Sequence, residues 1–169
     1  HLTFAYPNHK LTALYRPQRY QPLDNLILRA RERTGARLVP TSAKGVKALY
    51  RALADKQNIG ILPDQDPGNN GGIFVPFFGV TANTMALVSR LAQKSDAPVI
   101  YIYAERLPKG RGYHIHFHDA PDTTNDSDTI QSTTAINQGI EYCVREHPEQ
   151  YQWSYRRFKT RPEGEAGFY

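Results

Sequence analysis

Cysteine, methionine and tryptophan are nearly absent from this chain of 169 residues, in which each occurs once. A single cysteine excludes a disulfide framework and is compatible with a reducing compartment. Cys143 stands between Ile140 and Val144, and no activating group is close to it in the sequence. A free cysteine in such surroundings usually behaves as a small hydrophobic side chain. We therefore expect a buried thiol rather than a nucleophile.

Long apolar runs are also absent. No window approaches the roughly 18 consecutive apolar residues of a membrane-spanning helix, and no signal peptide opens the chain. The glycine-rich phosphate-binding motifs and the serine-hydrolase elbow are missing too, so nucleotide-dependent and serine-hydrolase chemistry have no support. The chain begins on His1 in mid-pattern, and we expect it to be a piece of a longer protein.

The composition is that of an ordinary globular protein, with 40% hydrophobic and 22% charged residues. The length suits one domain with a sizeable core, so we expect a single domain over residues 1–169. A formal charge of +5 favours anionic partners such as phosphates, nucleic acid or an acidic membrane surface. Solvated basic helix faces explain the charge equally well.

Apolar, β-branched runs alternate along the chain with windows of helical periodicity. Gly35 is a natural helix stop and Ser42 a candidate N-cap. The expected strands are 10–15, 36–40, 58–63, 73–78, 97–105 and 113–119, and the expected helices are 22–35, a helix after Ser42, 84–94, 128–146 and 148–158. This alternation predicts an α/β layered domain with a mostly parallel central sheet flanked by helices.

The stretch "DQDPGNNGGIFVPFFG" follows one of these strands and begins like a calcium-binding loop, with Asp64 and Asp66 two residues apart. Its fifth position is Gly68 and its twelfth is Val75, where such a loop needs a bidentate glutamate. A calcium site is therefore rejected.

Three histidines, His114, His116 and His118, alternate along an expected strand and so share one face. Three imidazoles could bind zinc, but histidines at this spacing along a strand lie too far apart for a single tetrahedral ion to bind all three easily. We favour a partly exposed strand face and expect no metal site. His114 and Asp119 have an H-x4-D spacing, but they would lie on opposite faces of the strand.

The ending "YQWSYRRFKTR" combines aromatic rings with cations, as surfaces that stack single-stranded nucleic acid do. The alternative is a C-terminal helix that packs Trp153 and Phe158 into the core and leaves Arg156, Arg157 and Lys159 outside. We favour this helix.

Two expected strands end in polar residues, one at Arg16 and the other at Asp64 and Asp66. Ligands of open α/β sheets bind at the carboxyl ends of strands, and the planar guanidinium of arginine makes bidentate bonds to phosphate. These residues are therefore candidates for one shared site.

Four blocks of the sequence together resemble the bacterial lipid A biosynthesis acyltransferases, the lauroyl/myristoyl acyltransferase family: "LTALYRP", "DQDPGNNGGIFVPFFGVTANT", "APVI" and "PEQYQWSYRRFKTRPEGE". They cover nearly the whole chain in the family's order. The resemblance implies a glycerolipid-acyltransferase-like fold and an enzyme of lipopolysaccharide biosynthesis at the cytoplasmic face of the inner membrane of Gram-negative bacteria.

Such an enzyme transfers a fatty acyl chain from acyl carrier protein to a hydroxyl of a phosphorylated glycolipid, the lipid A precursor. The resemblance implies no metal and no diffusible cofactor. It also gives the basic charge a purpose, because the lipid surface, the phosphosugar and the carrier protein are all acidic.

The family's mechanism uses a histidine of an H-x4-D/E motif as the base, upstream of the "LYRP" block. Here His1 is only a weak candidate, since Tyr6 stands where the carboxylate belongs, and His9 is followed at that distance by Leu14. We expect the pair and an N-terminal anchor to lie outside this chain, which by itself should not catalyse acyl transfer.

Six residues match the substrate-binding half of the family's site: Arg16, Asp64, Asp66, Gly79, Thr81 and Thr84. By this resemblance Arg16 binds acceptor phosphate. The two aspartates shape the acceptor pocket or hold a neighbouring arginine, with turn capping as an equal alternative. The last three belong to a G-x-x-A-x-T segment that leads into a helix, whose first amides would receive a phosphate or an oxyanion.

The competing interpretation is a non-catalytic basic module that binds anionic lipid or single-stranded nucleic acid. The resemblance makes nucleic acid an unexpected partner.

Overall fold

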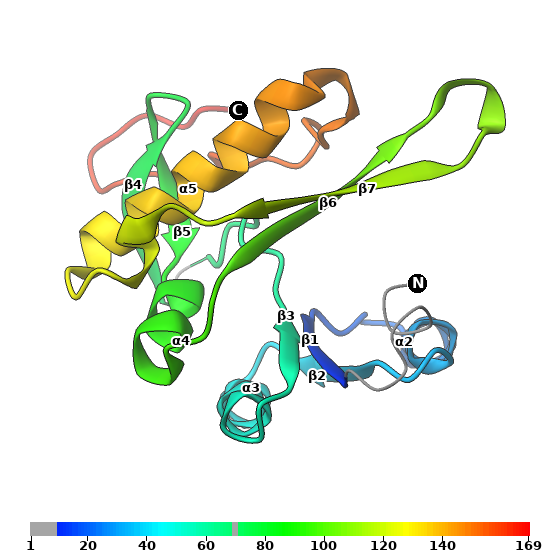
Figure 1. The fold of residues 1–169 in the computed structure, drawn as a ribbon. Helices are drawn as coiled ribbons and strands as arrows, with labels where there is room; N and C mark the ends of the chain where they lie inside the picture. Colours follow the sequence, from blue (N-terminus) through cyan, green and yellow to red (C-terminus); the bar gives the residue numbers. More distant parts are fainter. Residues whose placement is uncertain (1–9, 69–70) are drawn as a thin grey trace. The chain divides into compact units, whose positions relative to one another are not determined.

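The computed structural model describes residues 10–68 and 71–169 as a mixed α/β protein (Figure 1). The chain divides into two compact units, which we call unit 1 (His1–Leu62) and unit 2 (Pro63–Tyr169). The single domain over residues 1–169 stays a prediction.

Unit 1 contains a parallel sheet of three strands, β1 (Leu11–Tyr15), β2 (Arg37–Pro40) and β3 (Asn58–Gly60), in the order β2-β1-β3. Helix α2 (Gln21–Glu32) connects β1 to β2, and α3 (Ala43–Ala54) connects β2 to β3. Parallel neighbours require such crossovers. The strands and helices expected in this part of the sequence are present, although β3 ends at Gly60 rather than at residue 63 and α2 ends at Glu32 rather than at residue 35.

Two helix signals of unit 1 are confirmed in atomic detail. The Ser42 hydroxyl accepts a hydrogen bond from the amide of Gly45 at 3.4 Å, as an N-cap does. Gly35 follows α2 with a φ of +93°, a conformation that glycine adopts without strain. The local chemistry of these residues therefore sets where α2 ends and α3 begins.

The apolar face of α2 is not its buried face. Leu26 is 65% exposed, whereas Asp24 is only 4% exposed. The Asp24 carboxylate accepts hydrogen bonds from the Gln18 amide at 2.8 Å and the Tyr15 hydroxyl at 3.4 Å. This side of the helix therefore holds the loop that follows β1.

Unit 2 contains two antiparallel hairpins, β4 (Gly72–Phe77) with β5 (Val80–Met85) and β6 (Ile100–Arg106) with β7 (Tyr113–Asp119). The expected mostly parallel central sheet is therefore supported only for the three strands of unit 1. The physical reason is the length of the connections. The segments 78–79 and 107–112, which join the strands of the two hairpins, are too short for the crossover that parallel strands require. Helices α4 (Leu87–Ser95) and α5 (Thr129–Glu146) complete the unit.

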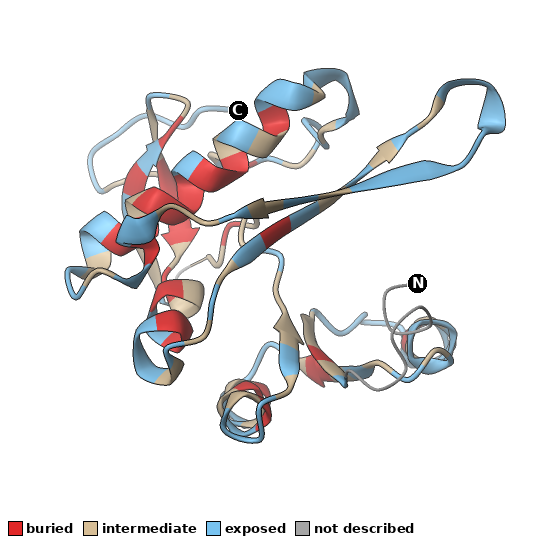
Figure 2. Ribbon diagram, viewed as in Figure 1, coloured by how far each residue is buried: buried red, intermediate tan, exposed pale blue. Residues whose placement is uncertain are grey.

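The core of unit 2 lies between α5 and the hairpins, and the buried residues gather on α5, β4 and β5 (Figure 2). Its buried apolar members are Phe77, Ala82, Tyr101, Ile136, Ile140 and Val144. Cys143 is half-buried and packs against this cluster, and burial raises the pKa of its thiol. This agrees with a packing role. In the part of the chain that is described, no helix combines the length and apolarity needed to cross a membrane.

Two expected helix boundaries are wrong. The helix expected from Thr84 begins at Leu87, because Thr84 continues strand β5 and pairs with Ile73. The last expected helix shrinks to a single 3-10 turn, Pro148–Gln150, and the chain then continues in turns.

Close packing of α5 on β6 predicts that Gly139→Ala will destabilise the protein. An added methyl group would approach two ring carbons and the hydroxyl oxygen of Tyr101 within 3.0 Å. That ring is buried, and its hydroxyl donates a 3.0 Å hydrogen bond to the Ile136 carbonyl, so it has little room to move. We expect a loss of about 1–3 kcal/mol in the free energy of unfolding, measured with urea.

Gly167→Ala is the control, because its nearest contact is at 3.9 Å and it should change stability by less than about 0.5 kcal/mol. Equal stability of the two variants would contradict the close packing.

Candidate functional site

The predicted site residues divide between the two units. Arg16 is exposed directly after β1, at the carboxyl end of that strand, as expected. Asp64 and Asp66 lie in unit 2, in the turn that precedes β4. The shared site stays a prediction.

Asp66 is buried, and both of its carboxylate oxygens have protein partners. Oδ1 accepts hydrogen bonds from the Gly68 amide at 2.7 Å and from the Asn83 side chain at 3.0 Å. Oδ2 accepts one from the Thr160 amide at 3.1 Å, and the Asp66 amide donates to the Tyr155 hydroxyl at 2.9 Å. Asp66 therefore caps its own turn and also ties that turn to the C-terminal segment.

Asp64 is half-buried and lies beside Tyr151. Burial, and then the negative charge and hydrogen bond of Asp64, raise the pKa of Tyr151 above its usual value. The tyrosine hydroxyl therefore keeps its proton and shares it with the Asp64 carboxylate.

Arg157 is only 3% exposed, although its position between Arg156 and Phe158 suggested a residue on the outside of a helix. Its Nη1 donates to the Asn83 carbonyl at 2.6 Å, and its Nη2 donates to the Thr84 hydroxyl at 2.7 Å. Burial lowers its pKa, and nearby tyrosine and aspartate side chains oppose that shift. The guanidinium is thus a structural cation at the centre of unit 2.

Asn137 of α5 completes this network. Its amide nitrogen donates to the Pro76 carbonyl at 2.7 Å and to the Thr84 hydroxyl at 3.0 Å, while its oxygen accepts from Arg157 at 3.4 Å. The Thr84 hydroxyl in turn donates to the Ala82 carbonyl at 3.1 Å. We call the five connected residues the polar hub: Asp66, Asn83, Thr84, Asn137 and Arg157.

Gly79, Thr81 and Thr84 do not form a helix N-terminus, which corrects the expectation for the G-x-x-A-x-T segment. Gly79 has a φ of +75° in the turn between β4 and β5, and the other two lie within β5. The Thr81 carbonyl accepts a hydrogen bond from Arg161. These residues therefore shape a hairpin and fasten the chain's ending to it.

The C-terminal aromatic residues are also placed differently from the expectation. Trp153 is 54% exposed, and its indole nitrogen donates to the Pro148 carbonyl at 2.7 Å. Phe158 packs against the core, as expected. A sequence signal for the buried arginine did exist: Asn83 and Thr84 are polar side chains within an apolar block, and buried polar groups need partners.

The family's catalytic histidine finds no counterpart among the described residues. His1 and His9 lie outside them. His114 and Asp119 fall on opposite faces of β7, as expected from their spacing.

Two groups of three side chains have donor atoms close enough to hold a metal ion, all within 4.8 Å of one another: Glu105 with His116 and His147, and His116 with His118 and Glu146. They lie on β6, on β7 and at the end of α5. The predicted site residues belong to neither group. The spacing of the histidines within one strand did not reveal either group, because the carboxylate of each group comes from another element.

The sequence model of the family described as "Bacterial lipid A biosynthesis acyltransferase" matches residues 1–160. The lipid A biosynthesis lauroyltransferase of Escherichia coli K12 is 34% identical over 153 residues, which are 89% of this chain and 49% of that protein. The palmitoleoyltransferase of the same organism is 32% identical over 94% of this chain and 51% of its own length. The myristoyltransferase of that organism is 27% identical over 97% of this chain and 50% of its own length. The chain thus spans about half the length of the curated relatives that it matches.

The polar hub predicts that Arg157→Ala will be severely destabilising. The change leaves a cavity in the core. It also removes the hydrogen bonds that Arg157 donates to Asn83, Thr84 and Asn137. We expect a loss of about 3–5 kcal/mol in the free energy of unfolding, measured by urea denaturation.

Arg156→Ala is the matched control, because Arg156 is exposed and its contact is a cation–π approach to Tyr169. The free energy of unfolding of this variant should fall by less than about 1 kcal/mol. Similar losses for the two variants would show that Arg157 does not hold the unit together.

Proposed function

The chain belongs to the bacterial lipid A biosynthesis acyltransferases, and on that premise we propose that it serves acyl transfer from acyl carrier protein to a hydroxyl of a lipid A precursor. The observation that carries the proposal is the family match over residues 1–160 together with 34% identity to a lauroyltransferase. We assign to this chain the binding of the acceptor.

The polar hub supports this proposal. It connects the block that starts at Asp64 to the block that starts at Pro148, which are the two most distinctive stretches of the family resemblance. The hydrogen bond from the Thr160 amide to Asp66 and those from Arg157 to Asn83 and Thr84 join them. Blocks that lie far apart in the sequence thus form one structural unit.

Arg16 is our candidate for the acceptor's phosphate. It is exposed and lies at the carboxyl end of β1, and a guanidinium offers two parallel donors to a phosphate. Lysine presents a single ammonium group instead, so the arginine also orients the acceptor.

The other predicted residues act on the site through its framework. Asp66 and Thr84 are buried and hydrogen-bonded within the hub, so we assign them positioning roles. Gly79 and Thr81 set the β4–β5 hairpin, and Asp64 holds Tyr151. Residues with such roles shape an acceptor pocket without contacting the reacting atoms.

The reaction itself needs a general base. The histidine of the family's H-x4-D/E pair would take the proton of the acceptor hydroxyl, and the alkoxide oxygen would form a bond to the thioester carbonyl carbon. Donors that stabilise the oxyanion of the tetrahedral intermediate lower the barrier. The intermediate then expels the carrier's thiolate, which takes up a proton.

The net charge of +5 supports acidic partners: the carrier protein, the phosphorylated glycolipid and the cytoplasmic face of the inner membrane. We also propose that the parallel strands of unit 1 belong to a central sheet of the glycerolipid-acyltransferase type. The alternative of a nucleic-acid-binding module is not favoured, since Arg157 of the basic ending is buried and unavailable to phosphate.

The proposed activity is tested by joining the 169-residue chain to the H-x4-E-bearing segment of a curated relative. The extended chain should transfer one acyl chain from acyl carrier protein to a lipid A precursor, detected by mass spectrometry of the lipid. The same protein with alanine in place of the segment's histidine should transfer none. A folded extended chain that leaves the acceptor unchanged would refute the proposal.

Arg16→Ala in this extended chain should raise the acceptor KM by about 10- to 100-fold, the effect of losing a charge-assisted pair of hydrogen bonds. Steady-state kinetics with varied acceptor measure it. Arg19→Ala, an exposed arginine of the same loop, should change KM by less than about threefold. An unchanged KM in Arg16→Ala would show that Arg16 is not the phosphate anchor.

A further inference from the structure

We propose that Glu105, His116 and His147 form a binding site for a zinc-class divalent metal ion, at the place where the β6–β7 hairpin meets the end of α5. The site lies entirely within unit 2 and does not depend on the proposed acyl transfer. Its ligand set, two imidazoles and one carboxylate, is one that zinc uses in proteins.

The donor atoms already have nearly the required spacing. Oε2 of Glu105 lies 2.9 Å from Nε2 of His116 and 3.6 Å from Nε2 of His147. Ligand bonds of 2.0–2.1 Å in a tetrahedral site put ligand atoms about 3.3 Å apart. All three donor atoms lie within 4.8 Å of one another, so a small adjustment of side chains completes the set.

The rings of the two histidines are held in place by other contacts. His116 stacks on Tyr103, its cross-strand partner, with ring centroids 4.6 Å apart and planes within 6°. His147 is the C-cap of α5, and its ring centroid lies 6.0 Å from that of Tyr103. A zinc ligand benefits from such fixation because less rotamer freedom is lost on binding.

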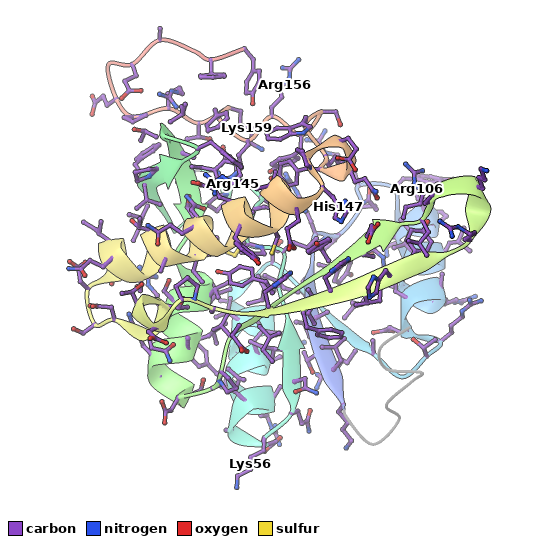
Figure 3. The ribbon with its side chains drawn as sticks, turned by 45° about the horizontal axis from the view of Figure 1, so that its top comes forward. Lys56, Arg106, Arg145, His147, Arg156 and Lys159 are labelled. Carbon is purple, nitrogen blue, oxygen red and sulfur yellow. The ribbon has the colours of Figure 1, made fainter. Side chains whose placement is uncertain are left out.

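The end of α5 is fastened to β6 beside these ligands. The Gln150 side chain accepts a hydrogen bond from the Arg106 amide at 2.8 Å and donates one to the Arg106 carbonyl at 3.3 Å. Figure 3 labels His147 at the end of α5 and Arg106 at the end of β6. This pair of hydrogen bonds brings His147 to Glu105, the residue before Arg106.

A second carboxylate lies near the other ring nitrogen of His147. Its Nδ1 lies 3.6 Å from a carboxylate oxygen of Glu149, while Nε2 faces Glu105. Metal-ligating histidines commonly donate their other ring N–H to a carboxylate, which fixes the tautomer and raises the basicity of the ligand nitrogen.

The neighbouring group of His116, His118 and Glu146 is the weaker alternative. Glu146 is exposed, and its Oε2 already accepts the Tyr103 hydroxyl at 2.6 Å. The ligand side chains of the proposed site are only 20–27% exposed.

A bound ion would add a cross-link between the β6–β7 hairpin and the end of α5. Two ligands come from the hairpin and the third from the residue that ends α5. Three protein ligands leave a fourth position for water or another small ligand. The ion would therefore stabilise the folded state of unit 2 by mass action.

The test uses the tag-free 169-residue chain with zinc chloride. Calorimetric titration should find one zinc ion per chain, and free zinc at 100 times the measured Kd should raise Tm by about 5–10 °C. Cobalt(II) should develop the visible bands of tetrahedral coordination.

Separate Glu105→Gln and His147→Gln substitutions should each abolish the zinc-dependent rise in Tm and the cobalt bands. His114→Gln is the matched control, because His114 also lies near Glu105, at 3.8 Å, but is not a member of the site. It should keep both signals.

His118→Gln distinguishes the two groups and should also leave binding intact. Loss of binding in His118→Gln with retention in Glu105→Gln would move the ion to the other group and overturn the proposal. No zinc binding by the unsubstituted chain would overturn it as well, and would identify the cluster as a set of ion pairs only.

Discussion

The burial of one guanidinium group is the constraint on which the rest of unit 2 depends. A buried cation needs hydrogen-bond partners, and the two terminal nitrogens of Arg157 donate to Asn83 and Thr84 of β5 and to Asn137 of α5. The strand, the helix and the C-terminal segment must therefore fit one another at this point. Asp66 extends the same network to the turn that precedes β4.

This arrangement explains why the distinctive blocks of the sequence are polar where a core would be apolar. Asn83 and Thr84 interrupt an apolar stretch because they accept hydrogen bonds from the buried arginine. Asp66 can be buried because its carboxylate accepts hydrogen bonds from the Asn83 side chain and the Thr160 amide. A framework of hydrogen bonds is more directional than apolar packing.

The histidines of β7 show the same rule at a half-buried position. His116 and His118 meet the carboxylates of Glu105 and Glu146, while Tyr103 lies between the two groups. These carboxylates come from β6 and from the end of α5, so the histidine spacing alone gave a misleading view of the cluster. The spacing of ligands within one strand matters less than what folding places opposite them.

By itself the sequence determined the order of most strands and helices, the end of α2, the start of α3 and the family. These follow from local signals: periodicity, the Ser42 cap, the positive φ of Gly35 and long specific blocks. Only the tertiary structure decided that Arg157 is inside and Trp153 outside, and that Glu105 and His147 converge on His116. The physical reason is that partners far apart in the sequence satisfy a buried charge, and no local pattern records where they come from.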